Sequence, residues 1–222
     1  TPTIVGLAQS IEGAQYLNAE LDQSNRPDLQ ADSVLDPTIF PEVHFVESTK
    51  EPQNILLTGA TGFLGAFLLD ELLQKTQANI YCLVRCPILE VGKEKLQRNL
   101  KRYSLLQYAY SDRIIPVLGD LSQPLLGLSS QQFYELASQI DVIYHNGAFV
   151  NLIYPYAPLR DANVLGTQEI LRLASQVKVK PVHYISTLDV FHSSHYAQNE
   201  MLSERDDFAG YTGPDGGYAQ SK

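Results

Sequence analysis

A tyrosine and a lysine four residues apart lie in the stretch GGYAQSK. If this stretch is helical, Tyr218 and Lys222 occupy the same face, one turn apart. An ammonium group beside a phenol favours the phenolate, so Lys222 is expected to lower the pKa of Tyr218 from its usual value of about 10. A tyrosine tuned in this way can donate a proton near neutral pH.

A second stretch with chemical meaning is TGATGFLG, Thr58–Gly65, in which three glycines follow a GxxGxxG spacing. An apolar run ends just before it and a helical pattern begins inside it, and this context makes such a motif informative. The turn lets the backbone approach a pyrophosphate, and the helix start offers free amides to its charge. A glycine-rich turn without a ligand is the alternative. The predicted cofactor contacts in this loop are Gly59, Thr61, Gly62, Phe63, Leu64 and Gly65.

The position about 20 residues beyond the glycines separates NAD from NADP in such folds, with a carboxylate there for NAD and an arginine for the 2′-phosphate of NADP. Arg85 occupies this position at the end of the run CLVR. A guanidinium matches phosphate geometry, and Lys95 adds a second positive charge. The sequence therefore predicts NADP(H), the alternative being that both residues are solvated surface charges.

Further polar and small residues follow the later apolar runs, where a parallel sheet gathers its ligands. A carboxylate at the third strand end would accept from adenine, and small residues at the fourth would let the cofactor lie close. Each residue alone is also compatible with ordinary turn chemistry. These predicted contacts are Asp120, Leu121, Asn146, Gly147, Ala148, Ser186 and Thr187.

These residues require a framework of alternating strands and helices. Apolar runs begin at Asn54, Asn79, Arg113, Asp141 and Pro181, and helical patterns separate them. This alternation predicts an α/β, Rossmann-like, doubly wound parallel sheet. Residues 1–16 have a helical period, and residues 17–51 read as a proline-punctuated linker with a short helix near Leu29–Val34. The dinucleotide-binding domain is assigned to residues 52–222.

Composition argues against several classes of partner and ligand. The 222 residues carry a net charge of −9, which disfavours nucleic acid. No apolar run reaches the length of a membrane span, and the N-terminus does not read as a signal peptide, so a soluble, cytoplasmic protein is expected. Cys82 and Cys86 are expected to be free thiols, too far apart in a strand for a disulfide. His192 and His195 lack a third ligand, so no metal is expected.

The ordered set TGATGFLG, GDL, HNGA, NVLGT, STLDV and YAQSK resembles the extended short-chain dehydrogenase/reductases. The segments YHNGAFVNLIYPYAPLRDANVLGTQEILRLA and YISTLDVF are similar to one branch of them. This branch comprises the thioester reductase domains of nonribosomal peptide synthetases, polyketide synthases and carboxylic acid reductases. The resemblance runs from about Pro52 to Lys222, and TPTIVGLAQSIE resembles the last helix of a carrier protein.

The resemblance implies a catalytic triad of Thr187, Tyr218 and Lys222. NADPH would reduce a thioester held on the phosphopantetheine arm of an upstream carrier protein, Tyr218 would protonate the oxyanion, and Thr187 would hydrogen-bond it. Lys222 would also hold the nicotinamide ribose. The product would be an aldehyde, with further reduction to an alcohol left open. A monomer is expected.

Two other readings remain open at the level of sequence. One is another extended reductase, such as a fatty acyl-CoA reductase or a nucleotide-sugar epimerase, and the other is a non-catalytic NADP-binding module. A doubly wound domain also needs sheet and substrate-binding elements after Lys222. The chain is therefore expected to be an incomplete reductase domain, inactive by itself.

Overall fold

The computed structural model describes residues 29–41, 51–191, 203, 214 and 216–222. They fall into two compact units. The sheet unit contains the described residues within 35–148 and 161–185. The Tyr218 unit contains residues 29–34, 149–160 and the described residues from Ser186 to Lys222. The predicted carrier-like helix at residues 1–16 lies outside the described residues.

Five parallel strands form the sheet of the sheet unit, in the order β3-β2-β1-β4-β5. The chain runs outward from β1 to β3 and then crosses back to β4, which pairs with the other side of β1. The carboxyl ends of β1 and β4 are therefore neighbours at the point where the winding reverses, which is where such sheets bind ligands. The predicted doubly wound fold is confirmed. The strands are β1 (Asn54–Thr58), β2 (Asn79–Val84), β3 (Ile114–Leu118), β4 (Val142–His145) and β5 (Val182–Tyr184).

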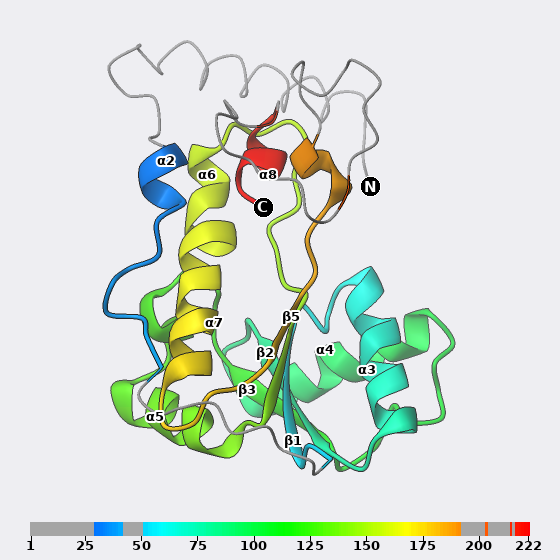
Figure 1. Ribbon diagram of the computed structural model, residues 1–222. Helices are drawn as coiled ribbons and strands as arrows, with labels where there is room; N and C mark the ends of the chain where they lie inside the picture. The colour runs from blue at the N-terminus through cyan, green and yellow to red at the C-terminus, as the bar shows by residue number, and fades with distance from the viewer. Residues whose placement is uncertain (1–28, 42–50, 192–202, 204–213, 215) are drawn as a thin grey trace. The chain divides into compact units, whose positions relative to one another are not determined.

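Helices cover both faces of this sheet (Figure 1). The first face is covered by α3 (Phe63–Lys75) and α4 (Leu89–Arg102), and the second by α5 (Ser130–Gln139) and α7 (Gly166–Ser175). Alternate strand residues point to opposite faces, so both sets of residues must be apolar. Ile55 and Leu57 pack on the first face and Leu56 on the second. This explains the near-continuous apolar runs of the sequence.

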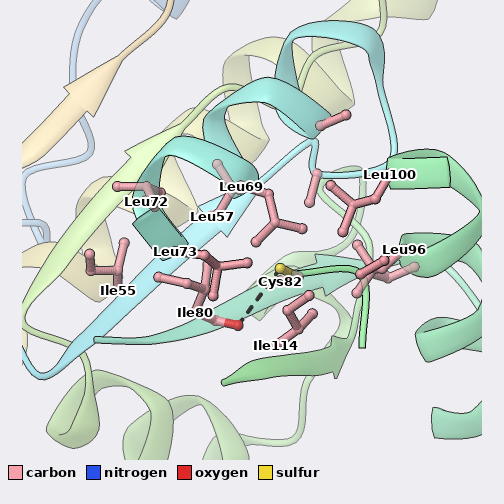
Figure 2. Packing of buried hydrophobic residues seen from close by; sticks show 14 of the residues in the cluster. Ile55, Leu57, Leu69, Leu72, Leu73, Ile80, Cys82, Leu96, Leu100 and Ile114 are labelled. Carbon is pink, nitrogen blue, oxygen red and sulfur yellow. Dashed lines mark hydrogen bonds between the residues drawn. The ribbon is translucent and has the colours of Figure 1, made fainter. Parts of the chain in front are cut away.

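Figure 2 shows the core on the first face, where α3 and α4 pack their leucines against the strands. Cys82 lies in this core and its thiol donates to the carbonyl oxygen of Ile80 at 3.7 Å. Burial raises the pKa of the Cys82 thiol. Cys82 and Cys86 are both free cysteines, as predicted.

Two predicted elements differ from the structure. The pattern LRDANVLGTQEILRLASQ predicts one helix, but a π-helical turn, η3 (Asp161–Leu165), separates α6 (Ala157–Arg160) from α7. The fifth apolar run predicts a strand reaching Thr187, but β5 ends at Tyr184. Thr187 instead directly precedes a short 3₁₀ helix, η4 (Leu188–Phe191).

The described part of the predicted linker makes ordered side-chain contacts in each unit. In the Tyr218 unit, Asp32 ends the short helix α2 (Leu29–Asp32). Its carboxylate accepts from both Arg160 Nε and Arg160 Nη2 at 2.6 Å. This pairing holds the pKa of Asp32 below its usual value. In the sheet unit, Arg172 donates to Asp36 at 2.9 Å.

None of the helices within the described ranges has both the length and the apolar character that crossing a bilayer would require.

Candidate functional site

The glycine-rich loop joins β1 to α3 and leaves almost no room for side chains. Gly59 has a φ of +72°, a conformation that L side chains rarely adopt. A Cβ on Gly65 would lie 2.0 Å from the carbonyl oxygen of Gly59, so this helix residue must be glycine. Gly62 precedes α3 as its N-cap without a side-chain cap. The first-turn amides of α3 therefore lack intrahelical acceptors and suit an anion.

Two hydrogen bonds from the residues that follow β4 hold this loop. Asn146 Nδ2 donates to the carbonyl oxygen of Gly59 at 3.4 Å, and Gly147 N donates to Thr58 Oγ1 at 2.8 Å. A Cβ on Gly147 would lie 2.6 Å from the side chain of Leu121. The predicted residues Gly59, Leu121, Asn146 and Gly147 are therefore brought together at one sheet edge, with Ala148 next in the chain.

The two predicted phosphate ligands lie close together, one after β2 and the other on α4. Arg85 follows the strand and its side chain is exposed, as is that of Lys95 on α4. Lys95 Nζ donates to the carbonyl oxygen of Arg85 at 2.7 Å. The structure therefore places the two positive residues side by side, with the guanidinium of Arg85 accessible to a ligand phosphate.

The end of β3 carries Asp120 in a local turn. One carboxylate oxygen of Asp120, Oδ1, accepts from the backbone N of Ser122 at 2.9 Å and from Ser122 Oγ at 2.8 Å. These two bonds form a local turn. Turn formation is therefore the role of Asp120 that the structure supports directly, and its predicted contact with adenine stays a prediction.

The predicted catalytic residues all belong to the Tyr218 unit. Thr187 is half-buried and its Oγ1 accepts from the backbone N of Asp189 at 3.2 Å, whereas Ser186 is exposed. Tyr218 lies in the four-residue helix α8 (Gly217–Gln220), which packs against η4 and α6 (Figure 1). The segment that follows Thr187 therefore lies beside the helix that carries Tyr218.

Gly217 fixes the position of α8. A Cβ at this residue would lie 2.3 Å from the carbonyl carbon of Pro155 and 2.4 Å from the backbone N of Tyr156. The start of α8 thus rests directly on the backbone of residues 154–156, and only glycine permits that approach. Tyr218 lies in this helix, but Lys222 lies past the C-cap Ser221, so the helix predicted to carry both residues ends before the lysine.

The electrostatics of this pair differ from the prediction. The pKa of Tyr218 is raised, first by burial and then by the negative charge of Asp189. Burial lowers the pKa of Lys222 to about 8. The expected lowering of the Tyr218 pKa by Lys222 is therefore wrong for this structure, because the sequence pattern gave no sign of the burial or of the Asp189 charge.

Sequence reasoning missed three further residues that shape the site. His145 Nδ1 lies 2.8 Å from Thr58 Oγ1 and its Nε2 lies 3.0 Å from Thr167 Oγ1, which ties β1, β4 and α7 together. Asn99 donates from α4 to the glycine-rich loop. The charge of Asp189 acts on Tyr218. The signal for His145 and Asn99 was a polar residue at a buried position of an apolar pattern.

The two histidines considered as metal ligands, His192 and His195, lie outside the described residues. Within the part of the chain that is described, no three histidine, cysteine or acidic side chains group as a metal site would require.

Comparison with known proteins agrees with this geometry. A family model for an NAD-binding domain, described as "Male sterility protein", matches residues 57–222. The chain belongs to this family. A component of the linear gramicidin synthase of Brevibacillus parabrevis is 48% identical over the whole chain, which covers 4% of that protein. The family resemblance inferred from the motifs is confirmed, and the cofactor is a nicotinamide dinucleotide.

Two solved structures extend the comparison. The terminal R domain from the myxalamid PKS-NRPS biosynthetic pathway has a TM-score of 0.82 and 49% identity, over 87% of this chain and 49% of that one. A thiolation-reductase di-domain from an archaeal non-ribosomal peptide synthetase has a TM-score of 0.58 and 28% identity, over 78% of this chain and 36% of that one. The chain thus spans half or less of the relatives that it matches.

Proposed function

We propose that the protein reduces a thioester, using NADPH, and releases the acyl or peptidyl group as an aldehyde. The observation that carries this proposal is the close likeness to a terminal reductase domain, in a chain that contains Thr187, Tyr218 and Lys222. The glycine-rich loop fits the cofactor because its three glycines and the open start of α3 form a cradle for a pyrophosphate.

When bound, NADPH supplies the hydride that reduces the thioester carbonyl carbon. Tyr218 donates its phenolic proton to the carbonyl oxygen as negative charge develops there. Thr187 Oγ1 already accepts from the Asp189 amide, and its own hydrogen is left to donate to the same substrate oxygen. Loss of the thiol from the resulting hemithioacetal yields the aldehyde.

The thiol that leaves belongs to the phosphopantetheine arm of a carrier domain. Support for this partner comes from the thiolation-reductase di-domain among the relatives and from the gramicidin synthase relative. The test supplies the full-length protein with NADPH and an acyl-phosphopantetheine thioester, and measures NADPH oxidation and aldehyde by mass spectrometry. Aldehyde and free thiol should appear in equal amounts. Release of a carboxylic acid without NADPH oxidation would contradict the proposal.

The choice of NADPH over NADH rests on Arg85. The Arg85 side chain is exposed, Lys95 donates to the Arg85 backbone carbonyl, and a charge-assisted bond to the 2′-phosphate should favour NADPH by about ten- to a hundredfold. Fluorescence titration should show this preference in the wild type and its loss in Arg85→Ala, with NADH affinity unchanged. Equal affinities of the wild type for the two cofactors would contradict the NADP assignment.

A further inference from the structure

Asn99 is a buried polar residue in an apolar environment. It lies on α4 between Leu96 and Leu100, which are fully buried, and is itself only 9% exposed. Its Nδ2 donates to the carbonyl oxygen of Ala60 at 3.0 Å and to that of Gly62 at 2.8 Å. Both hydrogens of the amide nitrogen are therefore directed at the glycine-rich loop, 37 and 39 residues earlier in the chain.

These two bonds add to the backbone hydrogen bonds of the loop, in which Gly62 O also accepts from Ala66 N at 3.2 Å. The carbonyl of Gly59 accepts from Gly62 N at 3.0 Å and from Asn146 Nδ2 at 3.4 Å. Asn99 engages two further carbonyls of the loop, those of Ala60 and Gly62. Carbonyl oxygens carry partial negative charge and would repel a pyrophosphate, so tying them to protein donors leaves the amide side of the loop for the anion.

The same helix also holds the other end of the cofactor site. Lys95 lies one turn before Asn99, and its ammonium donates to the carbonyl oxygen of Arg85 at 2.7 Å. One face of α4 therefore contacts both the loop after β1 and the end of β2, so it fixes the spacing between the two.

We propose that Asn99 is a positioning residue for the dinucleotide: it orients the glycine-rich loop so that its amides face the pyrophosphate. This inference rests on the proposed function, since it concerns the same cofactor site. Asn99 acts through the backbone of Ala60 and Gly62 and not through the cofactor itself. Loss of the Asn99 amide should therefore weaken the binding of ligands that contain a pyrophosphate and leave the binding of ligands that lack one unchanged.

The test compares Asn99→Leu with Gln97→Leu, a matched amide-to-leucine change two residues away on the same helix. NADP⁺ contains the pyrophosphate, and adenosine 2′-monophosphate lacks it. Calorimetric titration of the full-length protein should show NADP⁺ affinity reduced about tenfold or more in Asn99→Leu. Affinity for adenosine 2′-monophosphate should stay within about twofold, and Gln97→Leu should match the wild type for both ligands.

Asn99→Ser provides a second variant because it keeps one donor in a smaller side chain. It should fold if Asn99→Leu does not, and should bind NADP⁺ with an intermediate affinity. A folded Asn99→Leu or Asn99→Ser protein with wild-type affinity for NADP⁺ would overturn the inference alone. An equal loss of affinity for both ligands would also overturn the inference, because such a loss would indicate a general structural role for Asn99. A wild-type protein that binds neither ligand would overturn the proposed function as well.

Discussion

The two units hold their functional residues in different ways. In the sheet unit, the predicted cofactor residues other than Lys95 follow the strands of a parallel sheet. Asn99 and Asn146 donate to backbone carbonyls there, and Thr58 Oγ1 accepts from the Gly147 amide. In the Tyr218 unit, the predicted catalytic residues lie on or beside four-residue elements, η4 and α8. Backbone shape is thus the main determinant of the first site, and charge and burial are the main determinants of the second.

This contrast predicts two kinds of mutational response. Substitutions in the sheet unit should act on cofactor affinity and on folding. Substitutions at Tyr218 should act on the chemical step, and substitutions at Lys222 should act on the pH dependence of cofactor binding. Variants that show the opposite response would show that the two units do not divide the work in this way.

The largest effect is expected for Tyr218→Phe. The substitution removes the phenolic proton and keeps the ring, so the chemical step should slow by roughly 10²–10⁴-fold, the usual contribution of a positioned acid. NADPH affinity should change little. Single-turnover kinetics of the full-length protein and a fluorescence titration measure the two quantities. A wild-type rate in Tyr218→Phe would place the proton donor elsewhere.

A second, smaller effect separates two glycines of the loop. In Gly65→Ala the new Cβ would lie 2.0 Å from a backbone oxygen, whereas in Gly62→Ala its nearest atom is 3.3 Å away. Gly65→Ala should therefore lower the free energy of unfolding by about 1–3 kcal/mol and weaken NADPH binding, and Gly62→Ala should change stability less. Urea unfolding and NADPH titration of both variants check this. Equal responses of the two variants would argue against a loop that is fixed by backbone contact.

The smallest effect concerns pH. Burial lowers the pKa of Lys222 to about 8, so its ammonium is present below this pH and is lost as the pH rises through it. If the ammonium holds the nicotinamide ribose, NADPH affinity should fall by up to about tenfold between about pH 7 and pH 9. Lys222→Arg stays charged throughout and should flatten the profile.

A ligand that contains only part of the cofactor provides the control for this pH effect. Adenosine 2′,5′-bisphosphate lacks the nicotinamide ribose, so its affinity should not follow the titration of Lys222. If the pH profile of NADPH binding is the same in the wild type and in Lys222→Arg, Lys222 does not hold the nicotinamide ribose.

Periodicity and turn motifs predicted the sheet unit well. Its strands have apolar runs with sharp ends, and the GxxGxxG spacing can only be accommodated where a helix approaches a strand end closely, as Gly65 does. The π turn at Asp161–Leu165 and the early end of β5 were missed, because both depend on packing of the folded chain and not on local pattern.

The environment of Tyr218 could not be predicted from the sequence. The spacing of Tyr218 and Lys222 is visible in the sequence, but Asp189 approaches Tyr218 only through the fold. The role of Asn99 was hidden for the same reason, since its acceptors lie in another element. Short-range motifs therefore identified residue types, whereas the partners that tune them come from distant parts of the chain.

The most direct test of the central claim follows the hydride. The full-length protein is given NADPH that carries deuterium at both C4 positions, together with an acyl-phosphopantetheine thioester, and the released aldehyde is examined by mass spectrometry after one turnover. The account predicts one deuterium on the aldehyde carbon of every product molecule. Aldehyde without deuterium, or release of the acyl group as an acid, would contradict it.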